Sequence, residues 1–515
     1  MHLLIVSTGD PHIGHAYTMI IADVLARHKR NNGSNVMFLT GTDEYGMKIE
    51  QTAHSQGKTP ADLVEENSNK FRRLATAVNC SHDRFIRTTE SSHRLAVQKL
   101  WLQLQQSGHI YLDTYKGWYS IRDETFYSQE ELIDGKAPTG APVEWVEEES
   151  YFFRLSAWTQ SLLEHYQTHP DFVSPPGRMK ELLALVTSKG QLDDVSISRT
   201  SFTWGIPVPP QPSGTSPKEH VVYVWLDALV NYISALHYGE DSSSPLMKQF
   251  WPADVQIIGK DILRFHAVLW PALLLAVGLP PPRMLLAHGW WTMDGQKMSK
   301  SVGNVIDPIA LVDAYGSDYL RYFLLAETPT GSDGDFSMEA FARRINGDLC
   351  DVYGNLVQRV MSMAHKHCEQ SIPIPTLPLL ACDEELLAEA VAAAEMCTSQ
   401  YLPRGDIHRM IASIMAVARS GNKYAEQQAP WKLRKTDTAR MHTTLYVLIE
   451  LIRRLAIMLE PIIPDSTKDV FTQLNITTQG LSMSSLSDRL EGGQPIPKPT
   501  PIFKKIDTEN LLMTK

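Results

Sequence analysis

Cysteine is scarce in this chain of 515 residues: there are five, and no two of them stand in a Cys-x-x-Cys spacing. That scarcity argues against a disulfide framework and against a thiolate zinc site. Long apolar runs are missing too, because the stretch 267–280 is interrupted by Pro271 and is too short to span a bilayer. We therefore expect a soluble protein from a reducing compartment, without membrane contact and without a structural metal.

A targeting leader is also missing from the sequence. Residues 1–6 form a short apolar run with no basic amphipathic pattern, and the run is too short for a secretory signal. We expect no targeting peptide in this chain.

Positive charge is not in excess. The 48 Lys and Arg residues face 58 Asp and Glu residues, which gives a net charge of −10 and disfavours a nucleic-acid partner for the chain as a whole. Basic clusters nevertheless occur in the last third, at 343–344, 432–435 and 453–454. The apolar content of 43% is typical of a globular protein, and the length allows two to four domains.

What is present begins with one turn at 10–15, Asp-Pro-His-Ile-Gly-His, between an apolar run and a helical pattern. Strand, turn and helix together are typical of a phosphate site, because a helix N-terminus offers N–H groups and a positive dipole. Gly14 lets a ligand approach closely, and His12 and His15 lie on neighbouring positions of one helix face. Taken alone, such a pair is more often a solvated helix cap.

A second motif lies at 295–304, Gly-Gln-Lys-Met-Ser-Lys-Ser-Val-Gly-Asn. Lys297 and Lys300 stand in a loop bracketed by glycines, and they suit the charge of a polyphosphate leaving group. A lysine pair alone is most often a solvated surface turn. The complete motif, following the first one in this order, is a strong signal.

The two motifs resemble the HIGH and KMSKS signatures of class I aminoacyl-tRNA synthetases. From about Pro11 to near Asp507 the chain resembles methionyl-tRNA synthetases of the bacterial and mitochondrial type. The resemblance implies ATP-dependent formation of methionyl-adenylate and transfer of methionine to tRNA(Met), with release of AMP and diphosphate. Mg²⁺ would accompany the nucleotide. The implied catalytic residues are His12, Gly14, His15, Lys297 and Lys300. The implied ATP-binding residues are His12, His15, Gly259, Asp261, Lys297, Met298, Ser299, Lys300 and Ser301.

Strand and helix patterns alternate over the first 115 residues, which predicts an α/β fold with a doubly wound parallel sheet of the Rossmann type. The predicted strands are 3–6 and 36–39, and the predicted helices are 16–30, 47–56, 60–79 and 90–107. Ligands bind beyond the carboxyl ends of such strands, where His12 and the segment 41–46 both fall. Asp43 in that segment is equally compatible with a loop cap. The resemblance implies that it contacts the ammonium group of methionine.

Residues 116–205 interrupt the alternation with aromatic and acidic segments, and we interpret them as an inserted connective domain. In the family that the chain resembles, this domain often carries a zinc knuckle built on cysteines. The matching stretch 119–126 has no cysteine. We therefore predict that no metal is bound and that packing alone holds the knuckle.

The sheet is predicted to resume at 221–228 and at 255–261. A Trp at a strand end, such as Trp225, is usually a core residue. The resemblance instead implies a methionine pocket made of Asp43, Trp225, Ala228, Tyr232, Ile262 and His266. The chemistry agrees, because aromatic faces and a hydrogen-bonding group hold a thioether well. A wholly aliphatic pocket would discriminate poorly against leucine, since one methylene is worth only about 1 to 3 kcal/mol.

Helical periodicity dominates from 338 onward and predicts an all-α helix bundle. The expected helices are 338–367, 383–401, 404–427 and 439–459, preceded by a helix at 307–326 and a linker at 329–335. Asn355 and Arg359 share one helix face, and Trp431 follows Pro430 near a helix end. A polar surface and a core Trp are the ordinary explanations. The resemblance implies that Asn355, Arg359 and Trp431 read the anticodon, with the indole stacking on an unpaired base.

These patterns divide the chain into six parts. They are a first catalytic half (1–115), the connective insertion (116–205), a second catalytic half (206–280), the lysine loop and linker (281–337), the anticodon-binding bundle (338–490) and a C-terminal tail (491–515). We expect no appended dimerisation domain after the tail, and hence a monomer. By family type the expected location is the mitochondrial matrix, with the cytoplasm as the alternative.

Two other functions stay open at this point. One is a non-catalytic tRNA-binding protein derived from a synthetase, and the other is a class I synthetase for another amino acid. The intact lysine loop favours catalysis, and the set Trp225, Tyr232 and His266 favours methionine. Methionine-dependent exchange between ATP and diphosphate would separate the three.

One position departs from the family pattern. Where relatives have a longer first strand with a Tyr six residues before the first signature His, this chain has Val6. We expect weaker methionine binding and reduced activity as a result. Equal activity after a longer N-terminal strand is restored would refute this expectation.

Overall fold

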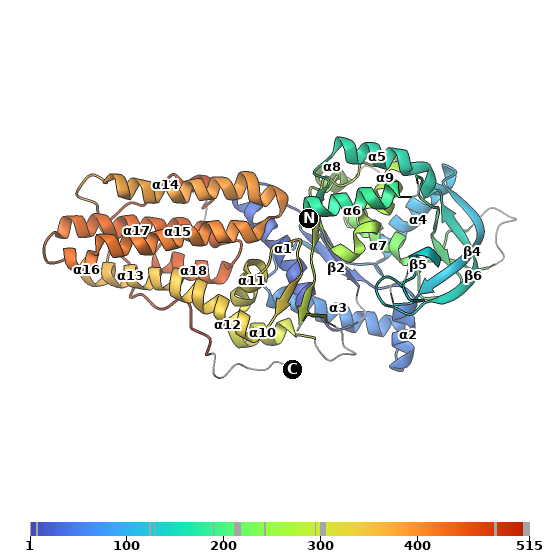
Figure 1. Ribbon diagram of the computed structural model, residues 1–515, viewed down its shortest axis with the longest axis horizontal. Coiled ribbons are helices and arrows are strands. Elements are labelled where there is room, and N and C mark those ends of the chain that lie inside the picture. Colours follow the sequence, from blue (N-terminus) through green and yellow to red (C-terminus); the bar gives the residue numbers. More distant parts are fainter. Residues whose placement is uncertain are drawn as a thin grey trace. The chain divides into compact units, whose positions relative to one another are not determined.

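The computed structural model describes residues 2–6, 9–122, 125–127, 129–188, 190–210, 218–240, 244–293, 295–298, 305–477 and 481–507 (Figure 1). The chain divides into two compact units, and each is assembled from segments far apart in the sequence. The first unit comprises Met1–Pro11, Met37–Ala75 and His82–Ala287, and the second comprises His12–Val36, Thr76–Ser81 and His288–Lys515.

The first unit is built on a six-stranded sheet with the strand order β3-β2-β1-β11-β12-β7. Its strands are β1 (His2–Val6), β2 (Leu39–Asp43), β3 (Arg84–Arg87), β7 (Val173–Ser174), β11 (Gln256–Gly259) and β12 (Leu285–His288). The pairs with a described register are parallel, which confirms the predicted Rossmann-type sheet. The strand predicted at 36–39 has the wrong bounds. It begins at Leu39 and continues to Asp43, because the β-branched Thr40 and Thr42 are themselves buried in the sheet.

The predicted strand at 221–228 is also wrong. Only Val221–Val222 (β10) is extended, and it pairs with β9 (Ser198–Arg199) in an antiparallel ribbon. Helix α7 (Val224–Ser234) starts two residues later and carries Trp225, Ala228 and Tyr232. This helix is buried at ten positions, and its first residues continue the short apolar run that begins at Val221. Such a run does not by itself distinguish a buried strand from a buried helix.

The first unit contains further helices and turns, of which the first three lie close to the helices predicted at 47–56, 60–79 and 90–107. They are α2 (Met47–Ser55), α3 (Pro60–Ala77), α4 (Ser91–Gln106), α5 (Thr159–Thr168), α6 (Pro176–Thr187), α8 (Pro245–Phe250), the 3₁₀ turn η3 (Lys260–Ile262), the π-helical η4 (Phe265–Leu269) and α9 (Trp270–Ala276).

The range predicted as an insertion contains a four-stranded antiparallel sheet of order β5-β4-β6-β8. The strands are β4 (Ile110–Ser120), β5 (Thr125–Tyr127), β6 (Glu144–Phe153) and β8 (Val195–Ser196), with the short turns η1 (Gln129–Glu131) and η2 (Leu155–Trp158) between them. Strand β7, from the same range, joins the main sheet beside β12. Tyr127, Ala137 and Ala141 form a small core beside the predicted knuckle.

The second unit contains helix α1 (Ile13–Asn31), a small sheet of order β14-β13-β15, and the predicted helix bundle. The sheet comprises β13 (Trp291–Met293), β14 (Gln296–Lys297) and β15 (Gly334–Phe336). The helices that follow are α10 (Pro308–Tyr315), α11 (Ser317–Ala326), α12 (Met338–Arg344), η5 (Ile345–Gly354), α13 (Asn355–His367), α14 (Ala381–Met396), η6 (Cys397–Tyr401), η7 (Leu402–Arg404), α15 (Ile407–Gln428), α16 (Pro430–Leu433), α17 (Thr438–Leu459), α18 (Pro464–Gln473) and η8 (Met483–Leu486). Helices α14, α15 and α17 pack against one another along their lengths.

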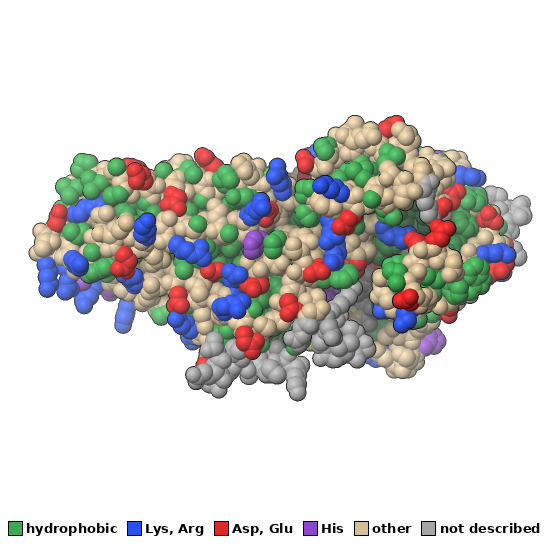
Figure 2. Space-filling view, viewed as in Figure 1, with side chains coloured by type: hydrophobic (Ala, Val, Ile, Leu, Met, Phe, Trp, Pro, Cys, Tyr) green, Lys and Arg blue, Asp and Glu red, His purple; other side chains and the backbone are tan. Residues whose placement is uncertain are grey.

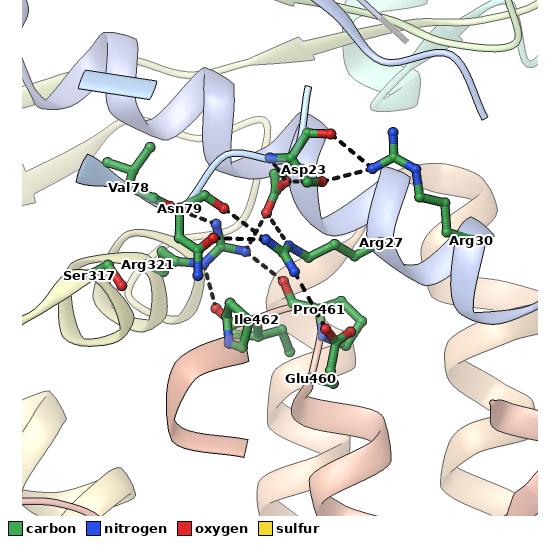
Figure 3. A network of polar contacts seen from close by, with 12 residues as sticks. Asp23, Arg27, Arg30, Val78, Asn79, Ser317, Arg321, Glu460, Pro461 and Ile462 are labelled. Atoms are coloured by element: carbon green, nitrogen blue, oxygen red, sulfur yellow. Dashed lines mark hydrogen bonds and ion pairs between the residues drawn. The ribbon is translucent and has the colours of Figure 1, made fainter. Parts of the chain in front are cut away.

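A buried polar network ties α1 to the bundle inside the second unit (Figure 3). Asp23 and Arg321 are fully buried and form an ion pair of 2.8 Å. Asp23 also accepts from Arg27 Nε at 2.7 Å and from Ser81. The Arg321 guanidinium donates to the carbonyls of Val78, Pro461 and Ile462. Such a fully hydrogen-bonded pair fixes α1 and α11 against the turn between α17 and α18.

Among the helices in the described part of the chain, none has the length and apolar character needed to cross a membrane.

Candidate functional site: two sequence motifs, an aromatic pocket and a half-buried tryptophan

The first motif forms the N-terminus of α1, in the second unit. His12 is the N-cap of the helix, and its Nδ1 accepts from the Gly14 N–H at 3.1 Å. His15 Nδ1 in turn accepts from the His12 N–H at 3.1 Å, so the two rings cap the helix reciprocally and stack 3.7 Å apart. A Cβ at position 14 would lie 2.9 Å from the His12 ring. A side chain at position 14 would therefore displace the His12 ring from the stacked pair.

These hydrogen bonds fix the proton positions of both rings. Because each Nδ1 accepts a backbone N–H, a neutral imidazole at either position carries its proton on Nε2. Burial lowers the pKa of His15 well below its ordinary value, and the neighbouring His12 lowers it further. At neutral pH, His15 therefore contributes a hydrogen-bond donor and no fixed positive charge.

Residue Thr18 connects this turn to the end of β12. Its hydroxyl donates to the Gly14 carbonyl at 3.0 Å and lies 2.8 Å from His288 Nε2. His288 is 6% exposed, and its Nδ1 lies 2.7 Å from the Gly289 carbonyl. The turn that carries His12 and His15 is thus held by a buried side-chain bridge within its own unit.

The second motif lies just after β13 in the same unit. Asp335 anchors its base, because one carboxylate oxygen accepts from Thr292 Oγ1 at 2.7 Å and from the Gly295 N–H at 2.9 Å. Lys297 ends β14, and Met298 follows it. Ser299, Lys300 and Ser301 lie outside the described residues, as does the side chain of Lys297.

The predicted methionine pocket lies in the first unit, on α7, η3 and η4. Tyr232 and His266 are hydrogen-bonded at 2.7 Å, and both are buried. Trp225 stacks on Phe265 with centroids 4.0 Å apart and meets the edge of His266 at 6.2 Å. Phe265 also lines a cavity of about 500 Å³ in this unit. The structure brings together Trp225, Tyr232 and His266, with Ile262 one helical turn before His266.

The proton of His266 can be placed as well. His266 Nδ1 lies 3.1 Å from the Ile262 carbonyl, so it carries the hydrogen and Nε2 accepts from the Tyr232 hydroxyl. Burial lowers the pKa of His266 to about 4, against smaller opposing effects of the Ile262 carbonyl and Asp261. The pocket therefore presents neutral aromatic surfaces at physiological pH, as an uncharged thioether requires.

Asp43 is the last residue of β2 and is 3% exposed. The next residue, Glu44, is fully buried and accepts from Thr42, Thr89 and Arg87, which fixes the turn directly after Asp43. Gly259 ends β11, two residues before the end of the predicted strand, and a Cβ there would lie 2.6 Å from the Asp261 carboxylate. Asp261 itself is exposed.

Sequence reasoning missed the side chains that hold α7. His93 on α4 lies 2.6 Å from Asp227 and 2.8 Å from Ser234, and all three are buried. Burial lowers the pKa of His93 to about 3 and raises that of Asp227 well above its ordinary value. Their buried hydrogen bond fixes the pocket helix to α4. No signal in the local sequence marks this contact, because its members are 134 residues apart.

The predicted anticodon residues lie on the bundle of the second unit. Arg359 is 5.3 Å from the Trp431 ring and pairs with Glu426 at 2.7 Å. Asn355 is exposed one helical turn before Arg359, at the start of α13. Exposed basic residues follow Trp431 at Lys432, Arg434 and Lys435, and Figure 2 shows Lys and Arg side chains gathered near this end of the bundle. Within the described ranges, no group of three or more His, Cys, Asp or Glu residues is arranged to hold a metal ion.

Comparison with known proteins gives two family matches, one to the catalytic part of the chain and one to the helix bundle. The family described as tRNA synthetases class I (M) matches residues 4–142 and 129–361, and the anticodon binding domain of methionyl tRNA ligase matches residues 374–513. The chain is 45% identical over 504 residues to the methionine--tRNA ligase of Rhizobium meliloti, covering 96% of each chain. It belongs to the methionyl-tRNA synthetases.

Other members of the family are equally similar. The methionine--tRNA ligase of Brucella suis is 47% identical over 503 residues, covering 96% of this chain and 95% of the relative. The crystal structure of the Mycobacterium tuberculosis methionyl-tRNA synthetase bound by methionyl-adenylate matches with a TM-score of 0.93 at 44% identity, covering 98% of this chain and 99% of that one. These three synthetases are bacterial, so they give no support to a mitochondrial assignment.

Two residues of this synthetase were missed as parts of the candidate site. Phe265 stacks on Trp225, and Asp335 anchors the second motif. The segment 329–335 was interpreted as a linker because it is rich in Thr, Gly, Ser and Asp. Its aspartates in fact bond to the backbone around β13, as Asp333 also does through the Trp290 N–H.

Proposed function

We propose that this chain activates L-methionine with ATP and transfers it to tRNA(Met). The observation that carries the proposal is the similarity to methionine--tRNA ligases over 96% of the chain, with every residue of both signature motifs retained. In the first step a methionine carboxylate oxygen attacks the α-phosphorus in line. An oxygen–phosphorus bond forms, the bond to the β-phosphate breaks, and diphosphate leaves. In the second step a ribose hydroxyl of the tRNA attacks the carbonyl carbon, and AMP leaves.

The protein supplies positioning and charge stabilisation in this chemistry. We assign the Nε2–H donors of His12 and His15 to the phosphate oxygens on which charge develops. Lys297 and Lys300 would neutralise the leaving diphosphate together with Mg²⁺ that arrives with ATP. Gly259 and Asp261 would line the adenosine, with Met298, Ser299 and Ser301 beside the phosphates.

Methionine would be held in the first unit by the pocket around His266. We assign its ammonium group to Asp43 and its side chain to Trp225, Ala228, Tyr232, Ile262 and His266. The neutral Tyr232–His266 pair and the stacked indole support a thioether over a charged side chain. For tRNA we assign anticodon contacts to Asn355, Arg359 and Trp431, with the indole as a stacking surface.

Methionine-dependent exchange of labelled diphosphate into ATP tests the proposal. We expect exchange with methionine and not with leucine, and charging of tRNA(Met) in a second assay. Exchange with another amino acid would reassign the substrate, and no exchange at all would leave only tRNA binding. A Lys300→Met variant provides a loss-of-function control.

Two further assignments are proposed on family type alone. The chain acts as a monomer, which light scattering of the purified protein tests. It acts in the mitochondrial matrix, with the cytoplasm as the alternative, and cell fractionation decides between them.

A further inference from the structure

The half-buried residue Trp431 stands at a sharp corner of the bundle. Helix α15 ends at Gln428, and Ala429 adopts a left-handed conformation with φ 44° and ψ 57°. Pro430 then starts the four-residue helix α16, which carries Trp431. A left-handed backbone is unfavourable for a residue with a Cβ, so the surrounding structure must hold this corner in place.

The residue that holds it is Arg440, near the start of α17. Its guanidinium makes a two-pronged ion pair with Asp383, at 2.6 and 2.7 Å. The same Nη2 also donates to Gln428 Oε1 at 2.8 Å. One side chain of α17 therefore binds the first turn of α14 and the last residue of α15 at once.

Asp383 is held in turn by its neighbours. It accepts from the Leu380 N–H at 2.9 Å and from the Tyr424 hydroxyl at 2.6 Å, and its side chain is fully buried. Burial alone would raise the pKa of Asp383, but the bonds from Arg440, Tyr424 and Leu380 outweigh it and lower the pKa to about 2. The carboxylate is thus a fixed anion, and it orients the Arg440 fork toward Gln428.

The amide of Gln428 is secured at both ends. Its Oε1 accepts from Arg440, and its Nε2 lies 3.7 Å from the sulfur of Cys382. The side chain that ends α15 is therefore fixed to α14 and α17 immediately before the left-handed Ala429. The direction in which α16 leaves the bundle depends on these contacts.

We propose that Arg440 and Asp383 are positioning residues for anticodon recognition: their buried pair holds the Gln428–Ala429 corner so that Trp431 faces the RNA. The inference rests on the proposed function, because it takes Trp431 to be a reader of the anticodon. Neither residue touches the RNA in this proposal. Both act through the geometry of the corner.

A structural role alone would predict a loss of stability without a specific loss of RNA binding. The same helix provides a matched control, because Arg454 also forms a buried pair, with Glu450 at 2.8 Å, and donates to the Leu387 carbonyl. Arg454 lies fourteen residues further along α17 and makes no contact with the corner. Arg440→Met and Arg454→Met therefore remove comparable buried charges at the two ends of one helix.

The test measures the affinity of the full chain for an RNA hairpin with the tRNA(Met) anticodon loop, by fluorescence anisotropy. A second hairpin has altered loop bases. We expect Arg440→Met to weaken binding of the first hairpin at least ten-fold and to reduce the preference over the second. Arg454→Met should lower the melting temperature by a similar amount but leave the affinity for the first hairpin and the preference over the second unchanged. Gln428→Met, which keeps the ion pair, should weaken binding three- to five-fold.

Equal effects of Arg440→Met and Arg454→Met would overturn the inference, as would full affinity in both Arg440→Met and Gln428→Met. If Arg440→Met does not fold, the hairpin affinity of Gln428→Met alone decides the inference, and full affinity in that variant overturns it. Methionine-dependent exchange is measured on the same preparations and should not change in any variant. Absence of exchange in the unaltered chain would reject the proposed function, whereas the hairpin affinities decide the inference independently.

Discussion

At the scale of single residues, the hydrogen bond from the Tyr232 hydroxyl to His266 Nε2 is the contact most open to test. Tyr232→Phe removes the donor and leaves a buried nitrogen without it, which costs about 1 to 3 kcal/mol. The His266 ring is then less firmly oriented in the pocket. We expect the KM for methionine in diphosphate exchange to rise about ten-fold, with kcat changed less than two-fold.

The matched variant is Tyr238→Phe, which also removes a buried hydroxyl from the first unit but lies outside the predicted pocket. It should leave the KM for methionine within two-fold. A rise in KM for both variants would show that the effect comes from general loosening of the unit, and it would contradict the assigned role of Tyr232.

At the scale of secondary-structure elements, the bridge from α1 to the end of β12 sets the position of the first motif. Thr18→Val keeps the side-chain shape but removes the hydroxyl that meets the Gly14 carbonyl and His288. The turn that carries His12 and His15 then loses its tie to the segment leading into β13. We expect kcat for diphosphate exchange to fall about ten-fold while the KM for methionine is unchanged. An unchanged kcat would contradict this positioning role.

The buried pair of Asp23 and Arg321 makes a second prediction for these elements. Arg321→Met leaves three carbonyls without their donor and takes one of two cationic donors from an Asp23 carboxylate oxygen, so the free energy of unfolding should drop by about 3 to 5 kcal/mol. Asp23→Asn should cost less, and the double variant less than the sum of both. Arg343→Met, which removes an exposed pair with Glu327, should cost under about 1 kcal/mol in the same urea titration. Exact additivity of the two buried changes would argue against a coupled network.

The helices and strands show which sequence patterns were sufficient to predict secondary structure. The amphipathic helices of the bundle were predictable because their apolar positions repeat with the helical period, as α13 and α15 confirm. Helix α7 was mistaken for a strand because its first residues continue the short apolar run from Val221, and such a run is compatible with a buried strand or a buried helix. The strand at β2 was shifted because its buried threonines look polar in the sequence. Both errors occur where tertiary burial, which local patterns do not encode, decides the structure.

The same limit applies to the candidate site. The spacing of His12 and His15 was enough to place them on one helix end, but their tautomers depend on backbone bonds that only the folded turn reveals. The stacking of Trp225 on Phe265 joins residues 40 positions apart. The clamp of Arg440 on Asp383 spans 57 residues. Contacts of this range leave no periodic trace in a single sequence.

At the scale of the whole molecule, histidines buried in the neutral form set the stability toward acid. Burial lowers the pKa of His93 to about 3 and the pKa values of His28 and His266 to about 4. In the unfolded chain each ring takes up a proton near its ordinary pKa of 6.5, while in the folded chain it stays neutral. Their stabilising contribution is therefore complete above pH 6.5 and is lost as the pH falls from 6.5 toward 4.

Each such ring adds a slope of about 1.4 kcal/mol per pH unit within that window, because the unfolded state binds one proton more. We expect the urea midpoint of the chain to be flat between pH 7 and 8 and to fall steeply below pH 6. His28→Gln removes one titrating ring from the second unit. The free energy of unfolding of this variant should therefore decline less steeply between pH 6 and 4.5, by the slope that corresponds to about one proton. A decline of unchanged steepness would mean that His28 is already protonated in the folded state, contrary to its burial at 3% exposure.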